Sequence, residues 1–231
     1  MDPLLALIFG LLIIIVGMVS LLVMRTCFSK FFRQIKESHA TAEINGPLDN
    51  CGVVAELARN VKTVYSLVGG GRYLSREKTV LLSYPPESKS LWALWEAAHE
   101  AGHAANPHPL ADLLASTPLR RTFSLAAPVA MSYFLGWQVA HKVASLVLLA
   151  VLMGLPLITL AAITHDEVRR CLFSRRWMRS YLEKQGCEIY QGIVAKMMYT
   201  EVAFEILDGL ALFLFFEGAV ILFFSLGRAS T

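Results

Sequence analysis

Four long stretches of apolar residues divide the chain. Residues Pro3–Met24 contain no charged side chain, and Thr122–Ala140, Val143–Ile163 and Gly209–Leu226 are nearly free of charge. Each stretch has about 20 residues, which is the number that a helix needs to cross the hydrocarbon core of a bilayer. The pattern therefore predicts a mainly α-helical, polytopic membrane protein with about four transmembrane helices.

A different pattern fills the region between the first two apolar stretches. Leu48–Asn60 has apolar residues on one helical face and predicts a short helix. Val61–Val68 and Lys78–Ser83 are rich in β-branched and aliphatic residues, and the run Gly69-Gly70-Gly71 separates them. We expect these two runs to form a small hairpin or a pair of short strands.

A second helix is predicted directly after the strands. Tyr84-Pro85-Pro86 ends the strand region, Ser88 or Ser90 can cap the next helix, and Leu91–Ala105 has a helical composition. We expect Val80–Ser83 to be the edge strand that precedes this helix. An exposed edge offers unpaired backbone groups, so an extended peptide substrate can add to it as a further strand.

Composition and charge fit a membrane protein. The 231 residues are 55% hydrophobic and 17% charged, which is too apolar for an ordinary soluble domain. The net charge of +3 reflects topology, and we expect no nucleic-acid partner. Nearly all basic residues lie between the first two apolar stretches or before the last one, in the segments 25–121 and 164–208. Because Lys and Arg stay on the cytoplasmic side, both segments are expected in the cytosol, at the plasma (inner) membrane.

The predicted helix Leu91–Ala105 carries the motif with the clearest chemistry, His99-Glu100-Ala101-Gly102-His103. Two histidines four residues apart lie one turn above each other, so both imidazoles can reach one Zn²⁺ ion. Glu100 lies about 100° around the helix, where it can take a proton from the water that the ion activates. The motif predicts a catalytic zinc site with His99 and His103 as ligands and Glu100 as general base.

The order of these elements resembles the YugP family of neutral zinc metallopeptidases. The resemblance rests on the N-terminal span, the β-rich segment ending in Val80-Leu81-Leu82-Ser83, the sequence AAHEAGHA at 97–104 and the later spans. Arg169-Arg170-Cys171-Leu172 is also similar to a family stretch that follows the third span. The family is more distantly similar to HtpX and the CAAX prenyl proteases. The resemblance implies that the segment after the third span donates the remaining zinc ligand.

The sequence leaves several candidates for the third zinc ligand. Thr164 stands where the family has its ligand glutamate, and threonine is a poor zinc ligand. His165, Asp166 and Glu167 follow within one helical turn, and each has a side chain that can bind zinc. We favour Glu167, because it is three positions beyond Thr164 and on a similar helical face, with His165 next. Glu201 is a weaker candidate, since a water-facing carboxylate is the commoner role for such a residue.

These patterns divide the chain into five segments. They are an N-terminal transmembrane helix (1–24), a cytosolic zincin-like α/β segment with the motif helix (25–121), a transmembrane hairpin (122–163), a cytosolic segment with the third ligand (164–208) and a C-terminal transmembrane helix (209–231). The expected function is zinc-dependent hydrolysis of a peptide or membrane-protein substrate at the cytosolic face of the bilayer. The alternative is a non-catalytic transporter or assembly factor that keeps a degenerate zinc site, which Thr164 suggests.

Overall fold

The computed structural model of the protein describes residues 3–38, 42–66, 71–115, 118–137 and 142–229. It is mainly helical and divides into two compact units. The first unit comprises Met1–Cys27, Leu110–His165 and Phe204–Thr231, and the second comprises Phe28–Pro109 and Asp166–Ala203.

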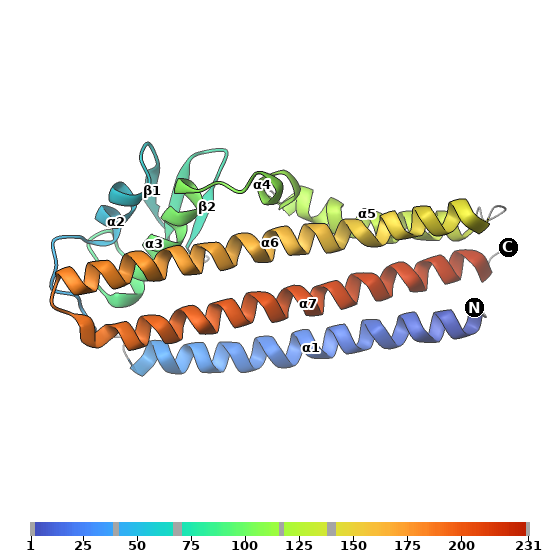
Figure 1. Ribbon diagram of the computed structural model, residues 1–231, viewed down its shortest axis with the longest axis horizontal. Coiled ribbons are helices and arrows are strands. Elements are labelled where there is room, and N and C mark those ends of the chain that lie inside the picture. The colour runs from blue at the N-terminus through green and yellow to red at the C-terminus, as the bar shows by residue number, and fades with distance from the viewer. Residues whose placement is uncertain (1–2, 39–41, 67–70, 116–117, 138–141, 230–231) are drawn as a thin grey trace. The chain divides into compact units, whose positions relative to one another are not determined.

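Long helices make up the first unit. They are α1 (Pro3–Ser38), α5 (Pro118–Trp137), α6 (Lys142–Lys184) and α7 (Gln191–Ala229), and the short α4 (Pro109–Ala115) precedes α5. Residues 28–38, 166–184 and 191–203 of these long helices belong to the second unit. Within this unit α1, α6 and α7 run side by side (Figure 1). Among the described residues three helices, α1, α6 and α7, are long and apolar enough to cross a membrane. The protein is therefore suited to a membrane. α5 covers residues 122–137 of the remaining apolar stretch, and residues 138–140 lie outside the described part of the chain.

Glycines let α1 and α7 approach closely. A Cβ atom at Gly17 would lie 2.8 Å from the backbone nitrogen of Phe215, and one at Gly218 would lie 2.8 Å from the backbone nitrogen of Ile14. Small residues at helix contacts are typical of membrane bundles, because close packing of the backbones is the main attraction available there. Arg25 and Asp208 add an ion pair of 2.8 Å between the same two helices.

A small sheet and three helical elements build the second unit. α2 (Asn50–Leu57) is followed by β1 (Lys62–Tyr65), β2 (Arg72–Leu74), β3 (Thr79–Leu82) and α3 (Leu91–Ala105). Parts of α1, α6 and α7 and the 3₁₀ turn Glu188–Tyr190 complete it. The predicted helices at 48–60 and 91–105 are confirmed, the first in a shorter form. Ser90 caps α3 by accepting a hydrogen bond from the backbone N–H of Ala93.

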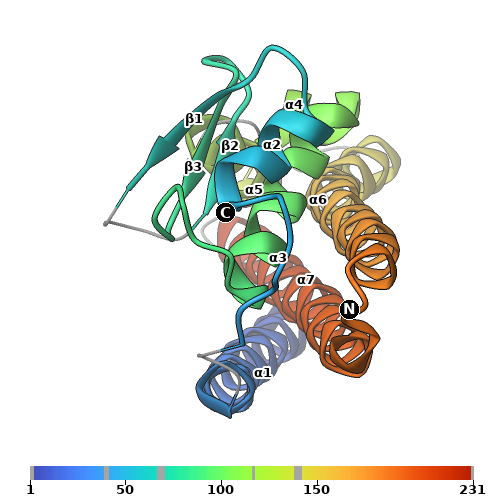
Figure 2. The ribbon, with the colours of Figure 1, turned by 90° about the vertical axis from the view of Figure 1, so that its left-hand side faces the viewer.

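The strand arrangement corrects two expectations. The strand order is β1-β3-β2, and Figure 2 shows β3 between its two neighbours. β1 and β3 are parallel, so a hairpin between them is wrong and the other expectation, a pair of short strands, is confirmed. The hairpin instead joins β3 to β2, which pairs with it in the antiparallel sense. The sequence pattern missed β2, which is only three residues long. The glycines expected as a breaker fall partly in residues 67–70, outside the described residues.

The expectation that Val80–Ser83 forms an edge strand is also wrong. β3 is central, and the side chains of Val80 and Leu82 are fully buried. The consecutive apolar residues of β3 explain the placement, because a strand covered on both faces has no polar alternation. Edge positions belong to β1 and β2, so β3 offers no free edge to a substrate.

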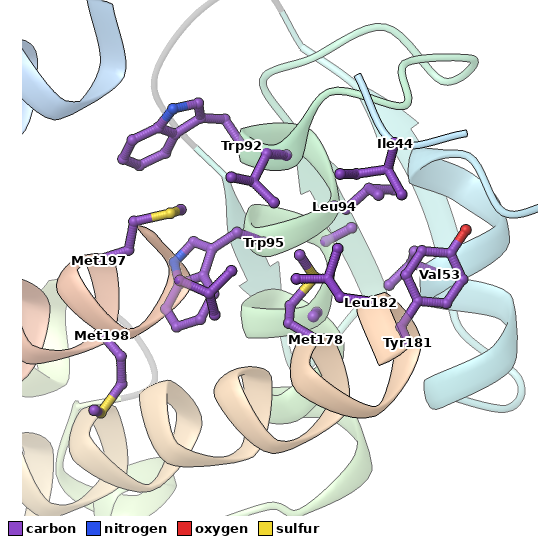
Figure 3. Packing of buried hydrophobic residues seen from close by; sticks show 14 of the residues in the cluster. Ile44, Val53, Trp92, Leu94, Trp95, Met178, Tyr181, Leu182, Met197 and Met198 are labelled. Carbon is purple, nitrogen blue, oxygen red and sulfur yellow. The ribbon is translucent and has the colours of Figure 1, made fainter. Parts of the chain in front are cut away.

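An apolar core holds α3 against its neighbours in the second unit. Figure 3 shows Trp92 and Trp95 of α3 packed with residues of α2, α6 and α7. The core includes the following buried side chains: Ile44, Val53, Val54, Val80, Leu82, Leu91, Leu94, Met178, Leu182, Met197 and Met198. The motif helix is therefore fixed by packing along its first turns, and its last turns carry the motif.

Candidate metal centre

The candidate centre lies where α3 meets α6 within the second unit. Gly102 permits the close approach, since a Cβ atom there would lie 3.0 Å from the Phe173 ring and 3.4 Å from the Arg170 side chain. On α3 the rings of His99 and His103 face the same side, with centroids 5.3 Å apart. α6 contributes Glu167 to the same point.

The three side chains have the spacing of ligands to one ion. Glu167 Oε2 lies 3.2 Å from His99 Nε2 and 3.5 Å from His103 Nε2. Two bonds of about 2.0–2.1 Å at a tetrahedral angle separate their outer atoms by about 3.3 Å. The side chains are 16%, 18% and 28% exposed for His99, His103 and Glu167 respectively, so water can reach the point. Two imidazole nitrogens and one carboxylate oxygen suit zinc, with a position left for water or substrate.

The other candidates for third ligand have different places. Asp166 Oδ2 lies 3.4 Å from His103 Nδ1, on the ring nitrogen opposite to the one that faces Glu167. Among the described residues a second group could also hold an ion, formed by His99, Cys171 and Glu201. His165 is exposed and belongs to neither group. Thr164 lies against Gly209 of α7, where its hydroxyl takes the space that a side chain at position 209 would need. Glu167 is thus the carboxylate that the fold brings to both histidines.

Behind His103 stands a buried ion pair. Arg170 is 2% exposed, and its Nη2 donates to the Asp166 carboxylate one turn earlier. Its Nη1 donates to the carbonyl oxygens of Gly102 and Asn106 at the end of α3. The Arg170 Nε atom also lies 3.2 Å from His103 Nδ1.

This pair fixes the role of each His103 nitrogen. Nδ1 can accept from Arg170 or donate to Asp166, but one nitrogen cannot do both. When Nε2 offers its lone pair to an ion, Nδ1 carries the proton and donates to Asp166. A carboxylate behind a metal-binding histidine orients the ring and makes it more basic. Asp166 therefore supports His103 and does not compete with Glu167.

Glu100 is buried beside the histidines and is 8% exposed. Burial raises the pKa of its carboxyl, and the nearby charges of His99 and His103 oppose this rise. When the pKa of a carboxyl lies nearer to neutral pH, the group can both take up and release a proton under working conditions.

The histidines carry more protons than free imidazole would. Burial lowers the pKa of His103, but the carboxylates of Asp166 and Glu167 outweigh it and raise that pKa to about 10. For His99 burial again lowers the pKa, and Glu167, Glu100 and Glu201 together raise it above its usual value. Without a metal ion, the positive charges of protonated His99 and His103 therefore balance the negative charges of the nearby carboxylates.

A second group of side chains faces the other nitrogen of His99. Cys171 Sγ lies 3.9 Å from His99 Nδ1 and donates to Glu201 Oε2 at 3.5 Å. Both Glu201 oxygens also accept from Trp95 Nε1 at 3.1 Å. The expectation of a water-facing role for Glu201 is therefore wrong, because its carboxylate is engaged inside the fold. Sequence reasoning missed Cys171, although its position four residues after Glu167 places both on one face of α6.

Comparison with protein-family models, curated proteins and solved structures gave no match for this chain. The function is therefore inferred from the geometry of the centre.

Proposed function

We propose that this protein is a zinc-dependent membrane metallopeptidase, with His99, His103 and Glu167 as metal ligands and Glu100 as general base. The observation that carries the proposal is the convergence of three ligand atoms, all within 4.8 Å of one another, beside a buried glutamate.

In this mechanism each protein group has a separate task. A zinc ion held by His99, His103 and Glu167 would lower the pKa of a coordinated water and polarise the carbonyl of the scissile bond. Glu100 accepts the proton that the attacking water loses as the new carbon–oxygen bond forms. The same proton passes to the amine nitrogen as the carbon–nitrogen bond breaks, which returns Glu100 to its starting state. Asp166 keeps the His103 ring in the tautomer that binds the ion.

The proposed location is the cytosolic face of the plasma (inner) membrane. Its support is the gathering of Lys and Arg in the segments 25–121 and 164–208. We propose that α5 completes a set of four spans, which returns the chain to the cytosol before the third-ligand segment. The substrate is a peptide or membrane protein that reaches the centre from that side.

The alternative is a non-catalytic transporter or assembly factor that keeps a degenerate zinc site, which Thr164 suggested. The carboxylate of Glu167 beside both histidines supports a complete set of three ligands instead. A protein that binds zinc but cleaves no peptide would favour this non-catalytic alternative.

The test combines metal analysis with cleavage of a diverse peptide library, read by mass spectrometry. We expect zinc-loaded protein to cleave peptides, and Glu100→Gln to keep zinc while losing cleavage by at least about 100-fold. Glu56→Gln, an exposed carboxylate on α2, is the matched control and should cleave as the wild type does. Equal cleavage by Glu100→Gln and the wild type would show that Glu100 is not the general base. Folded protein without zinc would contradict the proposal of a zinc metallopeptidase.

A further inference from the structure

A basic pocket opens on α6 beside the end of α3. It has a volume of about 210 Å³, which suits a small headgroup better than a drug-sized ligand. Arginines, two apolar residues and one amide line it: Asn106, Arg169, Arg170, Leu172, Phe173 and Arg176. None of the described lining residues is acidic, and all of them belong to the second unit.

Two of the three arginines carry charge that the protein does not compensate. Arg170 is committed to Asp166 and to the end of α3. Arg169 and Arg176 are exposed, and within the described ranges neither makes a hydrogen bond or an ion pair. They are seven residues apart on α6, which places them on one face about 10 Å apart.

Neighbouring arginines on the same helix behave differently. Arg175 lies over the Tyr199 ring, with its Cζ atom 5.2 Å from the centroid. Arg179 donates to Glu183 at 2.9 Å. The two arginines at the pocket are therefore distinguished from their neighbours by having no such contact.

The ligand that fits this lining is a phosphate group. Guanidinium groups bind phosphate through paired hydrogen bonds, and each contact is strengthened by charge. Leu172, which is 37% exposed, and Phe173 lie between the two arginines in sequence and give the pocket an apolar side. A phosphate attached to an apolar tail satisfies both features, whereas a free phosphate satisfies one.

The course of α6 identifies the source of such a ligand. α6 is one unbroken helix that contains a candidate membrane span, and its apolar run ends at Ile163. Arg169 follows six residues later, about 9 Å along the helix axis and at the outer side of the lipid headgroups, and Arg176 lies about 20 Å along the axis. Because helical side chains lean towards the N-terminus, the Arg176 side chain leans back towards the membrane, and both arginines line the same pocket. We propose that Arg169 and Arg176 bind the phosphate of an anionic membrane lipid in this pocket. The proposal needs the membrane helices but not the peptidase activity.

The binding test uses the full-length protein purified in neutral detergent. Phosphatidylglycerol or phosphatidylcholine is added, and native mass spectrometry counts the lipid that stays bound. We expect tighter retention of phosphatidylglycerol, and a loss of roughly tenfold or more in the double variant Arg169→Gln, Arg176→Gln. Arg179→Gln is the matched control, because that arginine already pairs with Glu183, and its retention should equal the wild type. Zinc content and the melting temperature should not change in either variant.

Competition identifies the source of the bound group. Inorganic phosphate alone should displace the lipid poorly, since it lacks the apolar part. Displacement by inorganic phosphate at concentrations equal to the lipid would mean a free-phosphate site and would overturn the lipid proposal. Displacement by a soluble peptide through its terminal carboxylate would assign the pocket to substrate instead. Equal retention of the two lipids, or equal loss in the Arg179→Gln control, would also overturn it.

Discussion

Replacing Glu167 by glutamine tests the assignment of the third ligand. The change preserves the shape of the side chain but replaces a carboxylate oxygen by a neutral amide, which is a much poorer ligand for zinc. The Oε2 atom lies 3.2 and 3.5 Å from the two histidine nitrogens, close to the 3.3 Å or so that a shared tetrahedral ion requires. We therefore expect Glu167→Gln to weaken zinc binding directly.

The expected size of the loss follows from the comparison with Asp166. Asp166 faces the far nitrogen of His103, so it acts on the metal only through that ring. Loss of such an outer partner costs about 10- to 100-fold in metal affinity. Loss of Glu167 itself should exceed that range, which corresponds to more than about 2.7 kcal/mol.

The assay is a competition titration of purified protein against a chromophoric zinc chelator. Asp166→Asn is the matched variant, one residue away on α6, and unfolding curves verify that both variants are folded. Glu167→Gln that binds zinc within a factor of three or so of the wild type would refute the assignment. A larger loss in Asp166→Asn than in Glu167→Gln would refute it too, because the two roles would then be exchanged.

Four further predictions concern the pH dependence of zinc binding, the pH dependence of stability, helix packing and topology. Because zinc binds deprotonated imidazole and the pKa of His103 without metal is about 10, zinc affinity should rise about tenfold per pH unit from neutrality towards pH 9, with proton release measurable by calorimetry in different buffers. In metal-free protein the raised pKa means that the protonated His103 imidazole stabilises the folded state, and this stabilisation is complete below the pKa of free imidazole. It should be lost as the pH rises through about 10, which a lower melting temperature would show. Gly17→Ala should lower the free energy of unfolding by about 1–3 kcal/mol, because the added Cβ would lie 2.8 Å from a backbone nitrogen of α7. Gly154→Ala is the control and should leave it unchanged, since no atom lies within 4 Å of the added Cβ. Denaturation curves measure both. In a variant without native cysteines, Cys at Ser88 and at Ser180 should both react with a thiol reagent from the cytosolic side only, and labelling from opposite sides would contradict the shared cytosolic location.

The sequence was sufficient where the signal is local. α3 begins and ends at the predicted residues, because Ser90 supplies a cap and Asn106-Pro107 ends the helical run. The long apolar runs predicted the helices α1, α6 and α7, because the signal of a membrane span depends only on composition and length. The preference for Glu167 rested on the resemblance, which implies a ligand at position 164; in the structure Glu167 lies beside both histidines, whereas Thr164 lies against Gly209 of α7.

Long-range packing was beyond these patterns. Whether β3 lies at an edge or in the centre depends on where β1 and β2 pair, and a short apolar strand is compatible with both. The engagement of Glu201 with Trp95 and Cys171 joins residues far apart in the chain, so no local period reveals it. Arg170 was similarly ambiguous, because basic residues after a span usually serve topology.

X-ray absorption at the zinc edge, combined with elemental analysis, tests the metal centre most directly. Protein purified under zinc-replete, chelator-free conditions should contain one zinc per chain, bound by nitrogen and oxygen atoms at about 2.0–2.1 Å, two of them from imidazoles. His99→Ala and His103→Ala should lose the metal while a separate replacement of Cys171 should leave the spectrum unchanged. Folded wild-type protein without zinc, or a spectrum with a sulfur ligand at about 2.3 Å, would contradict the centre formed by His99, His103 and Glu167.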